Sequence, residues 1–391
     1  MESPQPTPSR TFELFRRLDG EASSGVVPAG ERLSPWPEAP PWRPRMSKAQ
    51  LKEILPEADD RALWDQLSQS GEQGALEPSR GAVFSLPEDR AEGGVSAADK
   101  VRLAVNAAIH LRRPLLVSGD PGTGKTSLAY AIAWQLKLGP VLTWPITPRS
   151  RLREDGLYGY DAIGRLYATQ IAAAQLERPS GDLPAEAKTE AGGIGRFIKL
   201  GPVGTAFLPS RWPRVLLIDE IDKADLQLPN ELLHLFEEGQ FTLEELRREG
   251  GEASEEKVQT CDDREVCIRG GRVQCYEFPI VVMTSNRERD FPPAFHRRCL
   301  RIDMPKPTQA SLEQAVKRHF QGRGITWNPD HDGRLQQSIT AFLEGGNNPD
   351  RAIDQLLNSV YLLTQTSAEQ LQEAAAKELR QILQRRLSEG N

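Results

Sequence analysis

The chain has 391 residues, 38% of them hydrophobic and 27% charged, with a formal net charge of −6, which leaves room for about two to three domains with apolar cores. The negative charge argues against binding of polyanions over the whole surface, although it leaves a local basic patch open. The chain has no run of about 18 apolar residues and no apolar signal stretch, and its four cysteines fit a reducing compartment, so we expect a cytoplasmic protein without a membrane span.

Residues 1–94 are predicted to be an N-terminal arm with prolines, tryptophans, short helices and a linker. Residues 11–18 carry apolar side chains at helical spacing and are predicted to form a small helix. Residues 36–43 hold two tryptophans among prolines, which predicts an extended segment that either docks on another surface or packs on this chain's own core. Residues 47–69 predict helices broken by a proline, and residues 71–94 predict a polar linker.

An α/β core is predicted over residues 95–306, followed by a small all-α domain over 307–391. Two stretches of the core, 149–212 and 241–276, are too long for plain loops and are predicted to be insertions, the second ending in a hairpin around 269–272. Short, continuously apolar segments predict a five-stranded parallel sheet, so the predicted fold class is α/β. The predicted strands cover residues 114–118, 140–145, 214–218, 278–283 and 300–304.

The most informative motif is a glycine-rich stretch that fits the spacing G-x-x-x-x-G-K-[ST] at every fixed position. It lies between the predicted strand 114–118 and a predicted helix over 127–138, which is the context of a phosphate-binding loop. Glycines let backbone N–H groups approach phosphates, and the helix dipole favours their negative charge. Lys125 is predicted to contact the β- and γ-phosphates, and Thr126 to place its hydroxyl on Mg²⁺. The candidate nucleotide-binding residues are Gly119, Asp120, Pro121, Gly122, Thr123, Gly124, Lys125, Thr126 and Ser127.

A second motif completes the first, because the apolar strand 214–218 ends in Asp219 and Glu220. In a phosphate-loop enzyme an aspartate at this strand end supports Mg²⁺. Glu220 is then placed to polarise the water that attacks the γ-phosphate. The competing interpretation of Glu220 is a solvated acid at a turn.

The nucleotide is predicted to be ATP. Residues 222–225 have the sequence D-K-A-D, which is similar to the guanine-reading pattern N-K-x-D. However, the first position is Asp222, and the stretch follows the Mg²⁺ acid directly instead of ending a separate strand. Both departures argue against a GTPase.

With both motifs in place, residues from about 95 to 365 resemble the AAA+ ATPases and, within them, the MoxR-like branch. The resemblance implies an AAA+ phosphate-loop core followed by a helical lid. It implies that Asn286 is the sensor 1 residue, which holds the attacking water or the γ-phosphate. It also implies that Arg351, in a lid helix opening at 348–352, contacts the γ-phosphate as sensor 2.

The resemblance further assigns an arginine finger to the segment Ala294-Phe295-His296-Arg297-Arg298-Cys299, which is similar to the MoxR-type A-F-x-R-R-C. One arginine would reach the nucleotide of a neighbouring subunit and stabilise charge in the transition state. Arg298 is the first choice and Arg297 the second. Two arginines at a surface turn are also a common arrangement without such a role.

The function that the resemblance implies is a homo-oligomeric ring, a hexamer, that uses ATP to remodel or activate a partner protein. A von Willebrand A-type protein in a bacterial stress or conflict system is the implied class of client. The insertions would face the pore or the ring surface, which makes residues 157–160 and 269–272 candidate substrate-facing elements. Packed turns suit these residues equally well.

Two alternatives use the same core. A nucleic-acid motor or loader would need a basic stripe, but glutamates are interspersed among the arginines of the second insertion, so a mixed solvated surface is favoured and nucleic acid is not expected as a partner. The other alternative is a switch or scaffold that binds ATP and hydrolyses it slowly.

Overall fold

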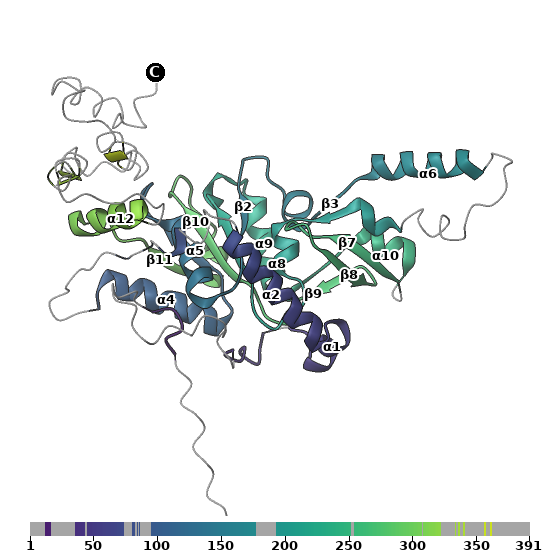
Figure 1. Cartoon of the computed structure of the whole chain (residues 1–391), viewed down its shortest axis with the longest axis horizontal. Helices are drawn as coiled ribbons and strands as arrows, with labels where there is room; N and C mark the ends of the chain where they lie inside the picture. The colour runs from purple at the N-terminus through teal and green to yellow at the C-terminus, as the bar shows by residue number, and fades with distance from the viewer. Residues whose placement is uncertain are drawn as a thin grey trace, which may run out of the picture.

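The computed structural model describes residues 12–16, 36–43, 45–73, 80–82, 84, 86, 95–176, 193–251, 254–306 and 308–321, with isolated positions between 333 and 361. A central sheet has helices on both faces, and a smaller sheet beside it leads to helix α6 (Ala162–Leu176), which projects outward (Figure 1). Among the described helices, none has the length and apolar character needed to cross a membrane.

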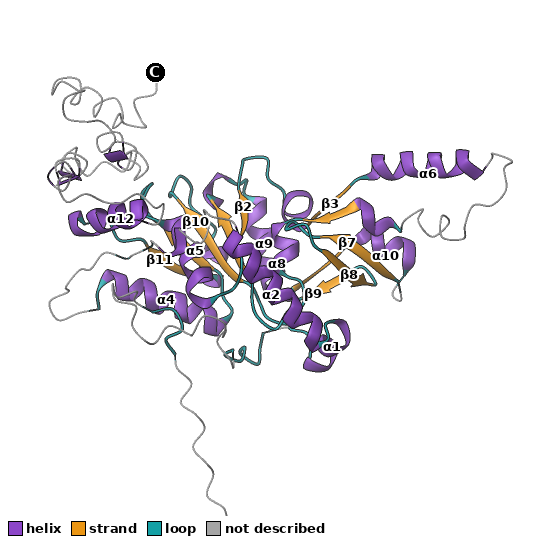
Figure 2. Cartoon of the chain, in the orientation of Figure 1, coloured by secondary structure: helices purple, strands orange, loops and turns teal. Residues whose placement is uncertain are grey.

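Five strands form the central sheet in the order β11-β1-β10-β5-β2, and all neighbours are parallel. Its middle strands are buried almost throughout because helices cover both faces (Figure 2). The predicted α/β class and parallel sheet are confirmed, and each strand begins within two residues of its predicted start. The strands are β1 (Leu115–Ser118), β2 (Leu142–Pro145), β5 (Val215–Asp219), β10 (Ile280–Ser285) and β11 (Leu300–Asp303).

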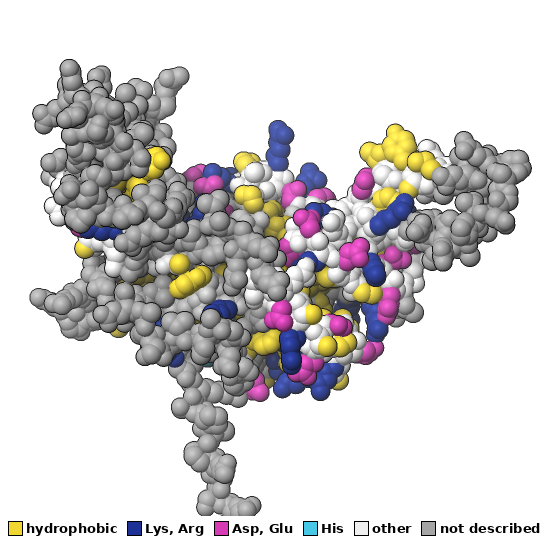
Figure 3. Space-filling model, viewed as in Figure 1, with side chains coloured by type: hydrophobic (Ala, Val, Ile, Leu, Met, Phe, Trp, Pro, Cys, Tyr) yellow, Lys and Arg dark blue, Asp and Glu magenta, His cyan; other side chains and the backbone are white. Residues whose placement is uncertain are grey.

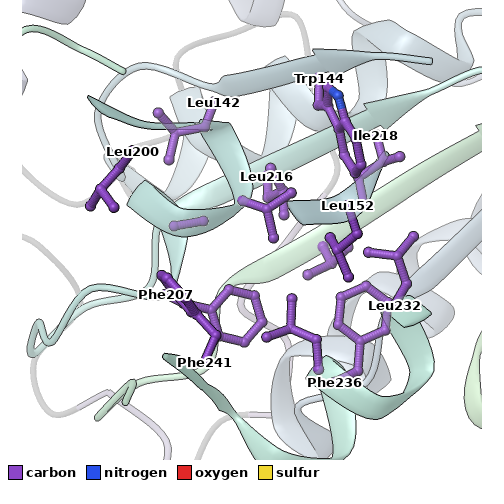
Figure 4. Close-up of a cluster of buried hydrophobic side chains, with 14 of the residues drawn as sticks. Leu142, Trp144, Leu152, Leu200, Phe207, Leu216, Ile218, Leu232, Phe236 and Phe241 are labelled. Carbon is purple, nitrogen blue, oxygen red and sulfur yellow. The ribbon is translucent and has the colours of Figure 1, made fainter. Parts of the chain in front are cut away.

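Two apolar cores lie on opposite faces of this sheet, because successive side chains of a strand alternate between them. Along β5, Val215 and Leu217 join one core and Leu216 and Ile218 join the other. Helices α4 and α5 cover the first core, and α8, α9 and α11 cover the second, part of which Figure 4 shows. The helices are α4 (Ala97–Leu111), α5 (Lys125–Leu136), α8 (Pro202–Ala206), α9 (Gln227–Glu238), α11 (Pro293–Arg298) and α12 (Gln309–Gln321).

The two predicted insertions meet in one second sheet, of order β3-β4-β7-β8. Its halves come from different insertions and are joined where Lys199 of β4 lies opposite Gln259 of β7. Pairing between segments so far apart leaves no local sequence signal, and the two insertions are therefore predicted as separate elements. The elements are η1 (Leu152–Leu157), β3 (Tyr158–Tyr160), η2 (Ile194–Phe197), β4 (Ile198–Leu200), β6 (Gln240–Thr242), α10 (Glu244–Gly250), β7 (Glu255–Gln259), β8 (Glu265–Arg269) and β9 (Arg272–Gln274).

The hairpin predicted around residues 269–272 is wrong in its position. The antiparallel hairpin is formed by β7 and β8, and its turn spans residues 260–264. At Gly270 and Gly271 the φ angles are 56° and 64°, and the chain passes from β8 into β9, which pairs with β6 instead. Two consecutive left-handed residues redirect the chain into another sheet, and glycine is the residue that adopts this conformation without strain.

Of the two interpretations of residues 157–160, packing is what the structure shows for Tyr158. This residue lies in β3 and is 3% exposed. Its hydroxyl donates to Glu245 Oε2 at 2.7 Å and accepts from the Glu244 backbone N–H at 3.2 Å. The tyrosine therefore joins β3 to α10 and is not presented as a gripping side chain.

The helix predicted over residues 11–18 is wrong for residues 12–16, which follow an irregular path. The backbone N–H groups of Leu14 and Phe15 both donate to Asn106 Oδ1 at 2.8 Å, and Asn106 Nδ2 donates to the Phe15 carbonyl at 2.9 Å. A buried side-chain amide of α4 thus takes over the hydrogen bonds that a helix would make within itself. The apolar spacing instead places Leu14 and Phe15 in the core.

Trp36 packs on the chain's own core, which decides one of the open alternatives for this residue. Arg112 lies within 6.0 Å of the Trp36 ring and donates to the Pro37 carbonyl. Its guanidinium also pairs with Glu277 at 2.9 Å, and these side chains are 3% and 6% exposed. Trp42 remains 74% exposed. The chain then continues into α1 (Lys48–Ile54) and α2 (Glu57–Gln73), with the predicted break between them.

The ion pair of Arg112 and Glu277 yields a stability prediction. Burial lowers the pKa of Arg112 and raises that of Glu277, while their mutual attraction opposes both shifts. Glu277→Ala would leave Arg112 buried without a counter-charge, and we expect a loss of about 3–5 kcal/mol in the free energy of unfolding, measured with urea. The exposed pair of Lys199 and Asp263 is the control, and Lys199→Ala should leave the midpoint unchanged. A wild-type midpoint in Glu277→Ala would contradict the assignment.

Candidate nucleotide-binding site

The phosphate loop connects β1 to α5 at the carboxyl end of the central sheet, where parallel sheets bind ligands. The φ angles of Gly122 and Gly124 are 77° and 86°, a left-handed conformation that glycine adopts readily. Helix α5 begins at Lys125 directly after this turn. The first N–H groups of a helix have no partner within it, so the turn leaves them available to an anion.

Lys125 lies across its own loop. Its Nζ donates to the carbonyl oxygens of Gly119 and Asp120, each at 2.8 Å, and the side chain is 7% exposed. Burial lowers the pKa of Lys125, and four nearby acids, with Asp222 first among them, oppose this shift. The ammonium is therefore held by neutral acceptors that phosphate oxygens can replace.

Asp219 accepts hydrogen bonds from two hydroxyl groups that belong to different elements. Its Oδ1 accepts from Thr126 Oγ1 at 3.0 Å and from Thr284 Oγ1 at 2.6 Å. The Thr284 hydroxyl in turn accepts from the backbone N–H of Glu220 at 2.8 Å. No local pattern in the sequence marks Thr284, because only the sheet order reveals that the ends of β10 and β5 are neighbours.

Glu220 has a φ angle of 60°, a conformation that non-glycine residues rarely adopt and that recurs at functional sites. Its carboxylate has two partners. Asn286 Nδ2 donates to Oε1 at 3.2 Å, and Lys223 Nζ donates to Oε2 at 2.6 Å from the short helix η3 (Ile221–Lys223). The predicted acid and the predicted sensor amide thus lie in direct contact, and Lys223 is a partner that the sequence does not reveal.

Thr126 and Asp219 are the residues suited to hold Mg²⁺. Their oxygens are adjacent, and hard oxygen donors are the ligands that this ion prefers. Within the described residues no group of three or more His, Cys, Asp or Glu side chains could hold a metal ion. A cation here would therefore depend on these two residues together with phosphate oxygens.

The two candidate finger arginines, Arg297 and Arg298, lie on α11. Arg298 Nε pairs with Glu237 of α9, and the Arg297 carbonyl accepts from Arg113 Nη1 at 3.3 Å. These partners lie outside the phosphate loop, so a role for either arginine at a nucleotide stays a prediction about a neighbouring subunit. Arg351 and residues 348–352 lie outside the described residues.

The bridging hydroxyl of Thr284 yields a second prediction. Thr284→Val removes the hydroxyl at nearly constant volume and leaves the Glu220 N–H without an acceptor, so we expect a loss of about 1–3 kcal/mol in the free energy of unfolding. Thr284→Ser keeps the hydroxyl and is the matched control, with a smaller expected loss. Urea unfolding of both variants measures the difference. Equal midpoints for the valine and serine variants would refute the bridge.

Known proteins resemble the part of the chain that holds this site. Residues 114–299 match a family model described as an AAA domain of the dynein-related subfamily. Curated proteins give no match. Among solved structures, NtrX from Brucella abortus in complex with ADP is similar with 14% identity and a TM-score of 0.41, covering 74% of this chain and 54% of that chain. The present chain thus spans about half the length of NtrX, and so weak a similarity transfers nothing to it. The family match therefore supports an AAA-type, nucleotide-binding domain over residues 114–299.

Proposed function

We propose that the chain binds ATP with Mg²⁺ and hydrolyses it to ADP and phosphate. The observation that carries the proposal is the meeting of Lys125 and Thr126 with Asp219, Glu220 and Asn286 at one end of the central sheet. At that end of the sheet, a phosphate-binding loop lies beside a carboxylate and an amide that can orient and deprotonate a water molecule.

The hydrolytic step follows from these contacts. On binding, the Lys125 ammonium moves from the carbonyl oxygens of Gly119 and Asp120 to the β- and γ-phosphate oxygens. Thr126 and Asp219 would hold Mg²⁺, which would supply neutralisation of phosphate charge when bound. Asn286 orients a water, and Glu220 accepts its proton as the water oxygen attacks the γ-phosphorus in line. The bond from phosphorus to the β-phosphate oxygen breaks, and ADP leaves.

The contacts of two side chains, Asp222 and Lys223, favour ATP over GTP. In the stretch similar to a guanine-reading motif, Asp222 is 3% exposed, and its Oδ2 accepts backbone N–H bonds from Asn286 and Glu288. Lys223 is engaged with Glu220. Both side chains are thus committed to the hydrolytic end of the site and are not available to read a base.

We further propose a ring of about six subunits, as the resemblance to the AAA+ ATPases implies, because head-to-tail contacts form a ring where the rotation between subunits closes. Arg298 projects from α11 with 42% of its side chain exposed, which suits an arginine that serves a neighbour. In this proposal the ring is of the MoxR-like type and remodels or activates a protein, with a von Willebrand A-type client in a bacterial stress or conflict system as the first candidate.

A protein client is favoured by the exposed apolar side chains of α6. Ile163, Leu166, Tyr167 and Ile171 are 69%, 58%, 62% and 58% exposed, and they recur at helical spacing. Figure 3 shows apolar side chains gathered on this projecting helix. Clustered exposed apolar surface commonly marks a protein contact.

The nucleic-acid alternative is less favoured. Arg269 pairs with Glu53 and Glu255, and Arg272 with Gln240. Figure 3 shows acidic and basic side chains interspersed on this side of the molecule. A groove of about 1420 Å³ beside α9 and α10 is likewise lined by both signs of charge, among them Glu231, Glu238 and Arg247. The slow ATP-gated switch remains a second candidate, because it would use the same residues.

Assembly and hydrolysis are tested first with Glu220→Gln. This variant should bind ATP and leave it unhydrolysed, so the solution mass should rise from that of a monomer to that of a ring of about six subunits on addition of ATP with Mg²⁺. Lys125→Ala is the control, and it should bind no ATP and show no shift. ATP binding without a change of mass would refute ATP-driven assembly by this chain alone, and normal ATP affinity in Lys125→Ala would refute the site.

The trans role of Arg298 is tested by mixing. Arg298→Ala and Glu220→Gln should each lack hydrolysis, because each lacks one half of the composite site. Mixed rings should regain phosphate release where an intact Glu220 in one subunit faces an intact Arg298 in the next. Hydrolysis by Arg298→Ala alone, together with an inactive Arg297→Ala that regains phosphate release when mixed with Glu220→Gln, would assign the finger to Arg297 instead.

A further inference from the structure

Asp222 is a buried acid to which the proposed hydrolytic step assigns no role. It lies in η3, two residues after Glu220, and is 3% exposed. Its Oδ2 accepts the backbone N–H of Asn286 at 2.8 Å and that of Glu288 at 3.0 Å. Its Oδ1 is buried and, within the described part of the chain, has no hydrogen-bond partner.

The two bonds join the turn of Glu220 to the segment that follows β10. Asn286 lies just beyond the last residue of that strand, so the sheet no longer holds its backbone. Its side chain donates to Glu220 at 3.2 Å. Glu220, Asp222 and Asn286 therefore form a closed circuit, in which Asp222 holds the backbone of Asn286 and Asn286 holds the carboxylate of Glu220.

We propose that Asp222 is a positioning residue of the hydrolytic site, which keeps Asn286 against Glu220 through the backbone of residues 286–288. The proposal rests on the proposed function, because it assigns a role in hydrolysis. Water attack requires tight alignment, and a misplacement of about 1 Å can cost about 10²-fold in rate. Asp222 acts through Asn286 and not on the phosphates, so its loss should lower kcat and leave nucleotide affinity intact.

The geometry separates two possible contributions of Asp222. One oxygen accepts both backbone bonds, so the carbonyl oxygen of an asparagine can replace it while the negative charge is lost. The charge faces Lys125, where burial lowers the pKa and Asp222 is the first of the acids that oppose this shift. If the charge were what matters, Asp222→Asn would disturb phosphate binding; if the acceptor matters, this variant should be normal.

The test compares Asp222→Ala and Asp222→Asn with a matched control on the same turn. Asp225 Oδ1 accepts two backbone N–H bonds of the same kind, from Gln227 at 2.9 Å and Leu228 at 3.0 Å, and has no link to Asn286. Each full-length variant is measured for hydrogen exchange of the peptide containing residues 285–289 without nucleotide, for kcat and KM of ATP hydrolysis with Mg²⁺, and for affinity toward a fluorescent ATP analogue.

Asp222→Ala should exchange faster at Asn286 and Glu288, and its kcat should fall about 10²-fold with KM and affinity near wild type. Asp222→Asn and Asp225→Ala should match wild type in both readouts. Unchanged exchange in Asp222→Ala, or faster exchange with wild-type kcat, would overturn the proposal. A fall of about 10²-fold in the kcat of Asp222→Asn relative to wild type would also overturn it, in favour of the charge. Because this comparison is made with wild type, it decides even if the alanine variant does not fold.

Failure of the proposed function gives a different result. In that case the wild-type chain would hydrolyse no ATP while Glu220→Gln bound it equally well. The role of Asp222 in hydrolysis would then fall together with the proposed function, whereas the exchange measurement would still report whether Asp222 holds the 286–288 backbone.

Discussion

The carboxylate of Asp219 ties together the elements on which a nucleotide site here depends. Its Oδ1 accepts from Thr126 at the start of α5 and from Thr284 near the end of β10, while Asp219 itself ends β5. The sheet order β1-β10-β5 places β10 between the strand of the phosphate loop and the strand of the acids. Any nucleotide that reaches from the loop to Glu220 must therefore pass over the end of β10, where Thr284 and Asn286 lie.

Around that junction, backbone groups do as much as side chains. The left-handed conformation of Glu220 turns the chain at the strand end, and the Thr284 hydroxyl accepts the N–H group that this turn leaves free. One turn later, Asp222 takes the N–H groups of Asn286 and Glu288. The positions of Glu220 and Asn286 are thus set by polar contacts that satisfy the backbone, and this kind of network holds a single geometry because each unmade bond is costly.

In the segments outside the core, burial decides which apolar side chains remain exposed and able to contact a partner protein. Trp36 and Pro37 are held on the core by Arg112, whose charge is balanced by Glu277. The two insertions satisfy their backbone in a shared sheet, and Tyr158 is buried in the process. Within the described part of the insertions, α6 keeps four large apolar side chains exposed, so the proposed protein contacts are better sought there than at residues 157–160.

The sequence by itself determined the class of the core and the local chemistry of the site. Short apolar strands, the glycine-rich loop with Lys125 and Thr126, and the acids Asp219 and Glu220 are signals carried by neighbouring residues, because strand burial and phosphate binding impose local spacing. Only the tertiary structure decided which distant groups meet. The strand order decided the hydroxyl bridge through Thr284 and the sheet shared by both insertions. Buried polar groups with partners elsewhere in the fold decided the contacts of Asp222 and the Asn106 hydrogen bonds that replace a helix at residues 12–16. No local sequence pattern exists for such contacts, because they join groups that the chain alone does not bring together.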